Sequence, residues 1–375
     1  MASTSFPTQS DVARVAKVSR STVSAILRSH PDDCPFDEGA KSRVLQAVQQ
    51  LNYRPHMAAA ALRSGRTRDL ALVVPNYEAI THTIQARIFE GAGSRAQELG
   101  YTLSVCTYDE KSPIRNSFSE LMRESRFDGA LLYGLHANQH ANQHDDRETV
   151  LSDLRVPHIV LEKDSLESAS INFNNVAGGR IATEHLLAAG RKRIAFFGYD
   201  HSTPYTNRCE GYRQALEAAG VHVDPALILR RQGKFDGTVH YMEALARSGR
   251  QAVDALIQDG VAFDAVLACT DEVALGAMQQ LARHGRRTPA DVAVIGFDAS
   301  PASGLSIPPL ASVFHDATTM GRQAIDMLDR MLRNAPKNRS EFEHRIIEPK
   351  LIVRESAPGS SAPGSDFPAV NSQRS

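Results

Sequence analysis

The stretch DVARVAKVSRSTVSAIL, residues 11–27, decides the fold of the N-terminal region. Its apolar residues fall at helical spacing in two short runs, and a capping-box pattern of Thr8 and Asp11 precedes the first run. Ser19 can cap the second run. The pattern predicts a helix-turn-helix, which is typical of DNA binding, with an ordinary helical hairpin as the alternative. The apolar residues expected inside are Val12, Ala13, Ala16, Val23, Ile26 and Leu27.

Polar residues remain on the exposed side of the second predicted helix, where they can meet base edges and phosphates. An arginine can make a bidentate contact to guanine, and an alanine methyl can contact thymine. The residues expected to read bases are Arg20, Ser21 and Ala25. The arginines expected to contact phosphates are Arg28, Arg54 and Arg63. Thr22 and Ser24 complete the candidate interface on this helix.

A third helix and a short Ala-rich segment follow the predicted helix-turn-helix. Two prolines and two aspartates in residues 29–35 predict a loop, after which Asp37 can cap the third helix. Residues 56–62 have high helix propensity but little apolar bulk, so they predict a helix that is only marginally stable alone. The third helix is expected to bury Val44, Leu45, Val48 and Leu51.

These segments occur in an order that resembles one protein family. YRPHMAAAALRSGRT (residues 53–67) resembles a hinge helix, and LALVVP (residues 70–75) resembles the first strand of an effector domain. With the helix-turn-helix, they resemble the lactose-repressor (LacI) family of transcription regulators. The resemblance implies that Leu62 is a wedge inserted into the minor groove, with a plain linker as the alternative. The chain departs from the family at Lys17, where glycine is usual.

Charge is distributed unevenly along the chain. The whole sequence carries 42 basic and 43 acidic residues and a net charge of −1. Residues 1–68 carry ten of the basic and five of the acidic residues, so this region has a charge of +5 and the remainder a charge of −6. We expect affinity for phosphate to be concentrated in the first 68 residues.

From Asp69 onward, apolar runs that predict buried parallel strands alternate with amphipathic helices, which indicates an α/β domain. Similar glycine spacing around Gly91 and Gly211 indicates two similar lobes. We expect residues 171–190 to cross between the lobes and residues 345–356 to complete the second lobe. The resemblance implies three crossings, the third near residues 309–313. The predicted strands are LALVVP, YTLSVCT, FDGALLYG, VPHIVLE, RIAFFG, FDAVLACT and VAVIGFD.

The predicted domains follow from these observations and the resemblance. They are a helix-turn-helix headpiece at residues 1–54, a hinge helix and linker at 55–68, and a two-lobed, periplasmic-binding-protein-like effector domain at 69–356. Residues 357–375 are rich in Pro, Gly and Ser and are expected to be disordered.

Loops after strands are the candidate effector site, because ligands of open α/β sheets bind outside the carboxyl ends of the strands. Arg208 resembles the family arginine that forks onto effector hydroxyls or carboxylates. Asp271 could accept two sugar hydroxyls, although an acid stabilised by a helix dipole is the alternative. Phe235 resembles a family aromatic beneath the ligand, with a core or lid residue as the alternative. Tyr77 is the candidate from NYEAITHTIQ, which replaces the family's Asn-Pro-Phe-Phe loop.

Other motifs add no function. GAGSRA (residues 91–96) formally matches a dinucleotide fingerprint, but the apolar spacing around it predicts the interior of a helix. The histidines of HANQHANQHDD (residues 136–146) recur every four residues, but nothing there would hold a helix, so we expect a polar repeat rather than a metal site. No catalytic motif, cofactor or metal is expected. Scattered cysteines and the lack of a signal peptide or bilayer-length apolar run predict a reducing cytoplasm.

The sequence therefore predicts a cytoplasmic, dimeric or tetrameric DNA-binding regulator, a repressor controlled by a small polar metabolite such as a sugar. Its headpieces would read half-sites of a pseudo-palindromic operator. One alternative is a cytosolic sugar-binding protein whose N-terminal helices mediate only protein contacts. Another is an α/β enzyme acting on a sugar or nucleoside, although the sequence shows no acid–base constellation.

Overall fold

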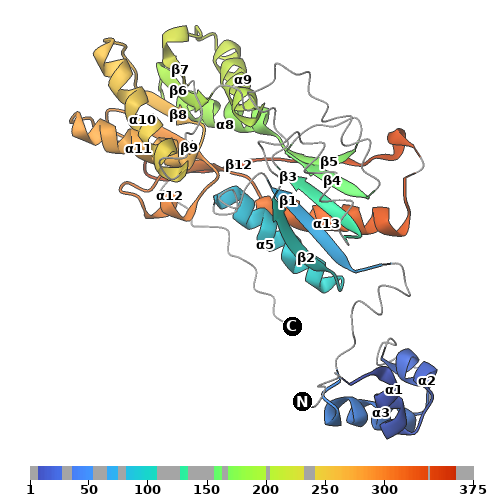
Figure 1. The fold of residues 1–375 in the computed structure, drawn as a ribbon. Helices are drawn as coiled ribbons and strands as arrows, with labels where there is room; N and C mark the ends of the chain where they lie inside the picture. Colours follow the sequence, from blue (N-terminus) through green and yellow to red (C-terminus); the bar gives the residue numbers. More distant parts are fainter. Residues whose placement is uncertain are drawn as a thin grey trace. The chain divides into compact units, whose positions relative to one another are not determined.

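The computed structural model describes residues 7–27, 36–53, 66–74, 82–107, 127–133, 156–162, 168–199, 203–231, 241–336 and 338–359. The chain divides between Arg68 and Asp69 into two compact units, each with its own core (Figure 1). Among the described helices, none has both the length and the apolar character needed to cross a membrane.

Side-chain caps fix the starts of the three helices described in the N-terminal unit. Thr8 and Asp11 form the predicted capping box, while the side chains of Ser19 and Asp37 accept backbone N–H groups at the starts of the next two helices. Lys17 ends the first helix with a φ of 56°, in the left-handed region. The predicted helix-turn-helix and third helix are confirmed. The helices are α1 Gln9–Ala16, α2 Arg20–Ile26 and α3 Glu38–Gln50.

The three helices share a small apolar core. Val12, Val23 and Val44 are fully buried at its centre, as predicted. The prediction for Leu45 is wrong, because this side chain is 46% exposed and the small residues of α3 face α1 and α2 instead. Arg43 of α3 donates from Nε to the Ala16 carbonyl oxygen at 3.4 Å, which ties α3 to the end of α1.

The first lobe of the second unit is a six-stranded parallel sheet in the order β11-β5-β4-β3-β1-β2. Its central strands are almost completely buried, which explains their continuous apolar sequences. Helices α5 and α13 pack against each other and supply apolar side chains to the same core. The elements are β1 Asp69–Val74, α5 Thr83–Glu98, β2 Thr102–Thr107, β3 Gly129–Tyr133, β4 His158–Leu161, β5 Ala169–Phe173, α13 Ala317–Arg333, η3 Arg339–Glu341 and β11 His344–Ile347.

The second lobe is a sheet of the same size in the order β12-β10-β9-β8-β6-β7, in which only the β10–β12 pair is antiparallel. Helix α8 packs against α9, and α10 packs against α11. All seven predicted strands are confirmed across the two lobes. The elements are α8 Asn175–Ala188, β6 Ile194–Tyr199, α9 Thr203–Ala218, η2 Pro225–Leu227, β7 Ile228–Arg231, α10 Tyr241–Gln258, β8 Ala265–Ala268, α11 Asp271–Arg283, β9 Ala293–Phe297, α12 Pro301–Leu305, β10 Ala311–Phe314 and β12 Lys350–Ile352.

The chain passes between the lobes three times in the described residues. The first passage, from β5 into α8, is confirmed. The passage predicted near residues 309–313 exists after β10, but it is the second along the chain rather than the third. The prediction that residues 345–356 complete the second lobe is wrong for β11, which pairs with β5 in the first lobe; only β12 joins the second. The change of lobe between two adjacent short strands explains this error.

Three helix pairs each meet at two glycines, where the two backbones touch. A Cβ atom at Gly211 of α9 would lie 1.9 Å from the carbonyl oxygen of Val176 in α8, a distance no side chain can accept. The same contact in the first lobe involves Gly91, which lies inside α5 and is therefore not part of a dinucleotide loop. The matching helix contacts support two similar lobes. The paired glycines are Gly91 and Gly321, Gly179 and Gly211, and Gly249 and Gly276.

Several predicted features lie outside the described residues. They are residues 29–35, the Ala-rich segment at 56–62, the histidine repeat at 136–146 and the tail beyond residue 359. The prediction of disorder is wrong for Ala357, which is buried and whose carbonyl oxygen accepts a hydrogen bond from His185 Nε2 at 2.8 Å.

Candidate DNA interface and effector site

The exposed side of α2 carries the residues predicted to read DNA. Arg20 and Ser21 are exposed, and Thr22, Ser24 and Ala25 are partly exposed. The Ser19 hydroxyl oxygen lies 2.6 Å from Ser21 Oγ and 2.8 Å from Thr22 Oγ1, and it accepts a hydrogen bond from the Thr22 backbone N–H at 3.0 Å. The start of α2 therefore presents a guanidinium and a cluster of hydroxyl groups, which can donate to phosphate oxygens and base edges.

Six further predicted contacts fall outside the part of the chain that the structure describes. They are Arg28, Arg54, Leu62 and Arg63 for DNA, and Tyr77 and Phe235 for the effector.

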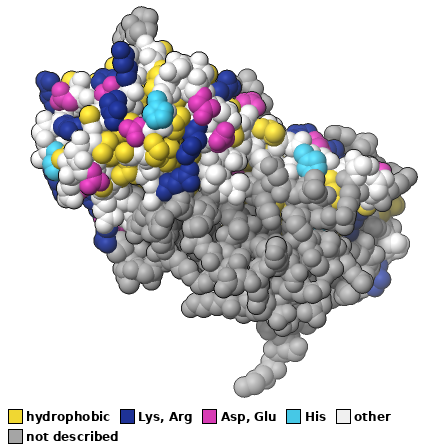
Figure 2. Space-filling view, turned by 90° about the horizontal axis from the view of Figure 1, so that it is seen from above, with side chains coloured by type: hydrophobic (Ala, Val, Ile, Leu, Met, Phe, Trp, Pro, Cys, Tyr) yellow, Lys and Arg dark blue, Asp and Glu magenta, His cyan; other side chains and the backbone are white. Residues whose placement is uncertain are grey.

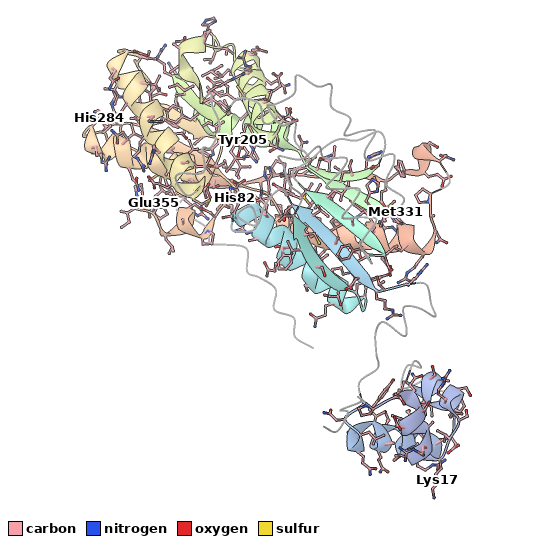
Figure 3. All side chains as sticks on the ribbon, viewed as in Figure 1. Lys17, His82, Tyr205, His284, Met331 and Glu355 are labelled. Carbon is pink, nitrogen blue, oxygen red and sulfur yellow. The ribbon has the colours of Figure 1, made fainter. Side chains whose placement is uncertain are left out.

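Arg208 is the centre of the polar cluster where the two lobes meet. Its side chain is buried; Nε donates to Asn175 Oδ1 at 2.8 Å, and Nη1 donates to the Cys269 carbonyl oxygen. The guanidinium lies 4.3 Å above the Phe297 ring and 5.4 Å from that of Tyr205, which Figure 3 labels. Its Nη2 is 3.7 Å from Asp298 Oδ1. These contacts hold the guanidinium in one orientation, as recognition of a small polar molecule requires.

His315 lies beside this arginine in the segment that joins β10 to α13. Its ring stacks on Phe173 with centroids 4.5 Å apart and lies 5.9 Å from Phe297. Burial, and secondarily the charge of Arg208, hold the pKa of His315 well below its ordinary value, so the imidazole is neutral. Neither ring nitrogen has a hydrogen-bond partner among the described residues.

Asp271, which was predicted to contact the effector, makes hydrogen bonds within the second lobe. It is fully buried at the start of α11; Oδ1 accepts from the Ser312 hydroxyl and Oδ2 from the Ser300 backbone N–H, both at 2.6 Å. Burial, and secondarily the neighbouring Asp298, raise the pKa of Asp271 to about 8. These contacts favour a structural role, because one oxygen is occupied by a hydroxyl of β10 and the other by a backbone N–H of the loop that follows β9.

Asp298 is the carboxylate that faces Arg208. It follows β9 directly, is almost fully buried and has a φ of 93°. Arg87 of α5, in the first lobe, donates to the carbonyl oxygens of Asp298 and Ala299 at 2.8 Å each, and its guanidinium lies 5.6 Å from the Phe314 ring. A side chain of the first lobe is therefore anchored to the loop that follows β9 in the second lobe.

A second cluster of polar side chains lies at the carboxyl ends of strands in the first lobe. The Tyr133 hydroxyl, at the end of β3, donates to Glu162 Oε2 at 2.6 Å and accepts from Gln85 Nε2 at 2.5 Å. Glu162 follows β4 with a φ of 58°. Tyr133, Glu162 and Gln85 thus form a hydrogen-bonded chain at the edge of the sheet where ligands of such folds bind.

Several buried polar atoms at the lobe junction lack hydrogen-bond partners in the described structure. They include Gln85 Oε1, Glu272 Oε2, Asp298 Oδ1, Ser300 Oγ and both ring nitrogens of His315. Buried polar groups normally find partners, since leaving one unpaired costs about 1–3 kcal/mol. A polar ligand with hydroxyl or amine groups would satisfy them.

Comparison with known proteins shows the family of the chain. Residues 8–56 match the family described as "Bacterial regulatory proteins, lacI family", and residues 183–357 match "Periplasmic binding protein-like domain". The HTH-type transcriptional regulator CelR of Thermobifida fusca is 31% identical over 93% of this chain and 98% of its own length. The chain belongs to the lacI family.

Other lacI-family proteins agree with this assignment. The HTH-type transcriptional repressor PurR of Haemophilus influenzae (strain PittEE) is 28% identical over 92% of this chain and 97% of its own length. A CelR–cellobiose complex matches 93% of this chain and 99% of its own, with a TM-score of 0.66 and 28% identity. A lac repressor dimer bound to operator has the same fold, with a TM-score of 0.77 and 24% identity over 95% of this chain and all of its own. These relatives are transcription regulators rather than enzymes.

As a lacI-family member, the chain is a DNA-binding transcription regulator. Two residues that lie beside Arg208 in the candidate effector site were not singled out in the sequence. Asp298 is the last residue of VAVIGFD and His315 directly follows β10, so the rule that ligands meet the ends of strands could have indicated both.

Proposed function

We propose that the protein is a repressor whose headpiece, residues 1–54, reads an operator and whose unit at 69–356 senses a small polar effector. Residues 55–68 would serve as hinge and linker. The observation that carries the proposal is the surface of α2, where Arg20 and Ser21 are exposed while Val23 and Ile26 are buried. The proposed DNA contacts are Arg20, Ser21, Thr22, Ser24, Ala25, Arg28, Arg54, Leu62 and Arg63.

The proposed effector carries several hydroxyl groups, and a sugar is the first candidate. Arg208 and Asp298 would contact it as donor and acceptor, and neutral His315 could accept one hydrogen bond and donate another. The unpartnered atoms at the lobe junction support this choice, as does the relative CelR, which was solved with cellobiose. Asp298 takes the place of Asp271 in the proposed site. Tyr77 and Phe235 stay proposed contacts from the sequence.

The proposed mechanism couples the two sites through the movement of the lobes. A homodimer in the cytoplasm would place two headpieces on the half-sites of a pseudo-palindrome. An effector bound between the lobes would change their relative position and with it the spacing of the two hinges. Effector and operator binding would then shift each other equally, typically by about 1–3 kcal/mol.

A gel-shift series over salt concentration tests the DNA interface. Arg20→Ala should lose affinity for the operator and keep its affinity for random DNA, because a base contact carries the specificity. Arg287→Ala removes an exposed arginine paired with Asp291 in the second lobe and should change neither. Equal losses of Arg20→Ala on operator and random DNA would contradict its role in base readout.

A thermal-shift screen of sugars and nucleobases tests the effector site, because a ligand that binds only the native state raises the melting temperature. A ligand found in this way should have little effect on Asp298→Asn, which loses the proposed acceptor charge. Asp291→Asn, an exposed aspartate of the same lobe, should respond like the wild type. An unchanged response of Asp298→Asn would contradict the proposed site.

A further inference from the structure

Three buried side chains from the two lobes converge beside the proposed effector site. His82 lies at the start of α5 in the first lobe, Glu272 lies in the first turn of α11, and Asp298 follows β9. One nitrogen or oxygen atom of each lies within 4.8 Å of the others. Figure 3 shows His82 where the two lobes meet. The exposed fractions are 8% for His82, 8% for Glu272 and 2% for Asp298.

The two carboxylates of this cluster each have one buried oxygen atom without a hydrogen-bond partner in the described structure. These atoms are Glu272 Oε2 and Asp298 Oδ1. The guanidinium of Arg208 has one nitrogen 3.7 Å from Asp298, while its Nε and Nη1 donate to Asn175 and Cys269, so its single charge can balance only one of the two carboxylates. Two neighbouring carboxylates in a site of low dielectric are stable only with a proton or a further cation.

We propose that His82, Glu272 and Asp298 bind a divalent first-row metal ion, such as Zn²⁺, between the lobes. One imidazole nitrogen and two carboxylate oxygens form a typical donor set for such an ion, whereas Mg²⁺ and Ca²⁺ prefer oxygen ligands alone. Ligands about 2.1 Å from a tetrahedral zinc lie roughly 3.4 Å apart, so binding would draw the three side chains slightly together. The fourth position stays open to water or to an effector hydroxyl.

The metal would join the first lobe to the second. His82 precedes α5 in the first lobe and both carboxylates come from the second lobe, so the ion would stabilise the arrangement in which the lobes touch. Its effect on operator affinity rests on the function proposed above, but the binding of the metal does not.

Direct titration tests the site. Untagged full-length protein is stripped with EDTA, dialysed into buffer without chelator, and titrated with Zn²⁺ in a calorimeter. The wild type should bind one ion per chain at this site. His82→Ala and Glu272→Gln should each weaken its affinity about a hundredfold or more, since even changes outside the ligand shell cost 10–100-fold. His284→Ala is the matched control and should bind like the wild type, because His284 pairs with Asp254 on another part of the second lobe.

The histidine repeat is the competing location for zinc. A variant with His136, His140 and His144 all changed to alanine should keep the site. Loss of binding in this variant, no binding by the wild type, or unchanged binding in both His82→Ala and Glu272→Gln would overturn the proposal. Circular dichroism in EDTA checks that the variants are folded, and Glu272→Gln preserves side-chain shape. Operator binding in EDTA, measured by gel shift, reports separately on the proposed function.

Discussion

Lys17 occupies a backbone conformation that glycine adopts without strain. Its φ of 56° and ψ of 43° lie in the left-handed region, which costs an ordinary L-residue about 1 kcal/mol. Lys17→Gly should therefore stabilise the N-terminal unit by up to about 1 kcal/mol, because relief of strain exceeds the entropy that glycine adds to the unfolded chain. Calorimetry of the full-length protein, followed through the transition of this unit, measures the gain.

Asn52 provides the matched control for Lys17. It also has a positive φ, of 47°, just after α3. Asparagine tolerates this region better than lysine, so Asn52→Gly should gain less stability. A larger gain for Asn52→Gly than for Lys17→Gly would show that strain does not decide the effect.

His158 makes the stability of the first lobe depend on pH. It is buried at the start of β4; Nδ1 donates to the Val156 carbonyl oxygen at 2.9 Å, and Nε2 accepts from the Ser168 hydroxyl at 2.7 Å. Burial lowers the pKa of His158 below its ordinary value of 6.5. Below about pH 6.5 the unfolded chain gains a proton that the folded protein does not take up. The free energy of unfolding therefore decreases as the pH is lowered, by at most about 1.4 kcal/mol per pH unit.

Urea unfolding between pH 5 and 7.5 measures this effect. His158→Gln should unfold more readily at every pH but lose the part of the pH dependence that His158 supplies. His222 is exposed, so His222→Gln should keep the slope of the wild type. Identical slopes for His158→Gln and the wild type would refute the assignment to this residue.

Helices α8 and α9 approach so closely that only glycine fits at their contact. Gly211→Ala would place a methyl group 1.9 Å from the Val176 carbonyl oxygen, which must push the two backbones apart. We expect a loss of about 3 kcal/mol or more in the free energy of unfolding of the second unit, at or above the upper end for overpacking. Denaturant unfolding followed by circular dichroism measures the loss.

Replacement of Gly93 by alanine is expected to increase stability, in contrast to the same change at Gly211. Gly93 lies in α5, and a Cβ atom there would meet nothing within 4 Å. Gly93→Ala should stabilise by about 0.5–1 kcal/mol, because alanine loses less entropy than glycine on forming a helix. Similar effects of Gly93→Ala and Gly211→Ala would mean that helix propensity, rather than the backbone contact, determines both.

Helices and strands were predictable from the sequence where a side-chain cap fixes the start of a helix or where a strand is buried along its whole length. The capping box at Thr8, the caps at Ser19 and Asp37, and the continuously buried strands all leave local patterns. Strand β11 was misplaced because a short strand whose residues alternate between exposed and partly buried fits the edge of either lobe, and only its pairing with β5 decides between them. Leu45 was misplaced because two alanines of α3 let the neighbouring helices approach, which removes the need for a larger side chain.

Sites that require both lobes were less predictable. Arg208 could be found from its sequence context, and the ends of strands could have indicated Asp298 and His315, but only the fold shows that these two residues lie beside Arg208. His82 and Glu272 are separated by 190 positions and meet through the fold alone. The surface drawn in Figure 2 mixes basic and acidic side chains, so charge on its described part marks no further site.

Arg87 links the two lobes and should control how strongly effector and operator binding are coupled. Its two hydrogen bonds of 2.8 Å to the Asp298 and Ala299 carbonyl oxygens hold the first lobe to the loop that follows β9 in the second. A hydrogen bond from a charged donor contributes about 1.5–3 kcal/mol, so Arg87→Ala should weaken the apparent effector affinity about tenfold or more and reduce the effect of effector on operator binding.

Fluorescence anisotropy of a labelled operator, with and without the sugar found by the thermal-shift screen, measures this coupling. The matched control is Arg322→Ala, which breaks a pair with Glu98 at 2.9 Å inside the first lobe and should leave the coupling unchanged. The change in operator affinity caused by effector must equal the change in effector affinity caused by operator, in the wild type and in both variants, because the two describe one free energy. Wild-type coupling in Arg87→Ala together with weakened coupling in Arg322→Ala would show that the lobes communicate through the α5–α13 contact rather than through Arg87.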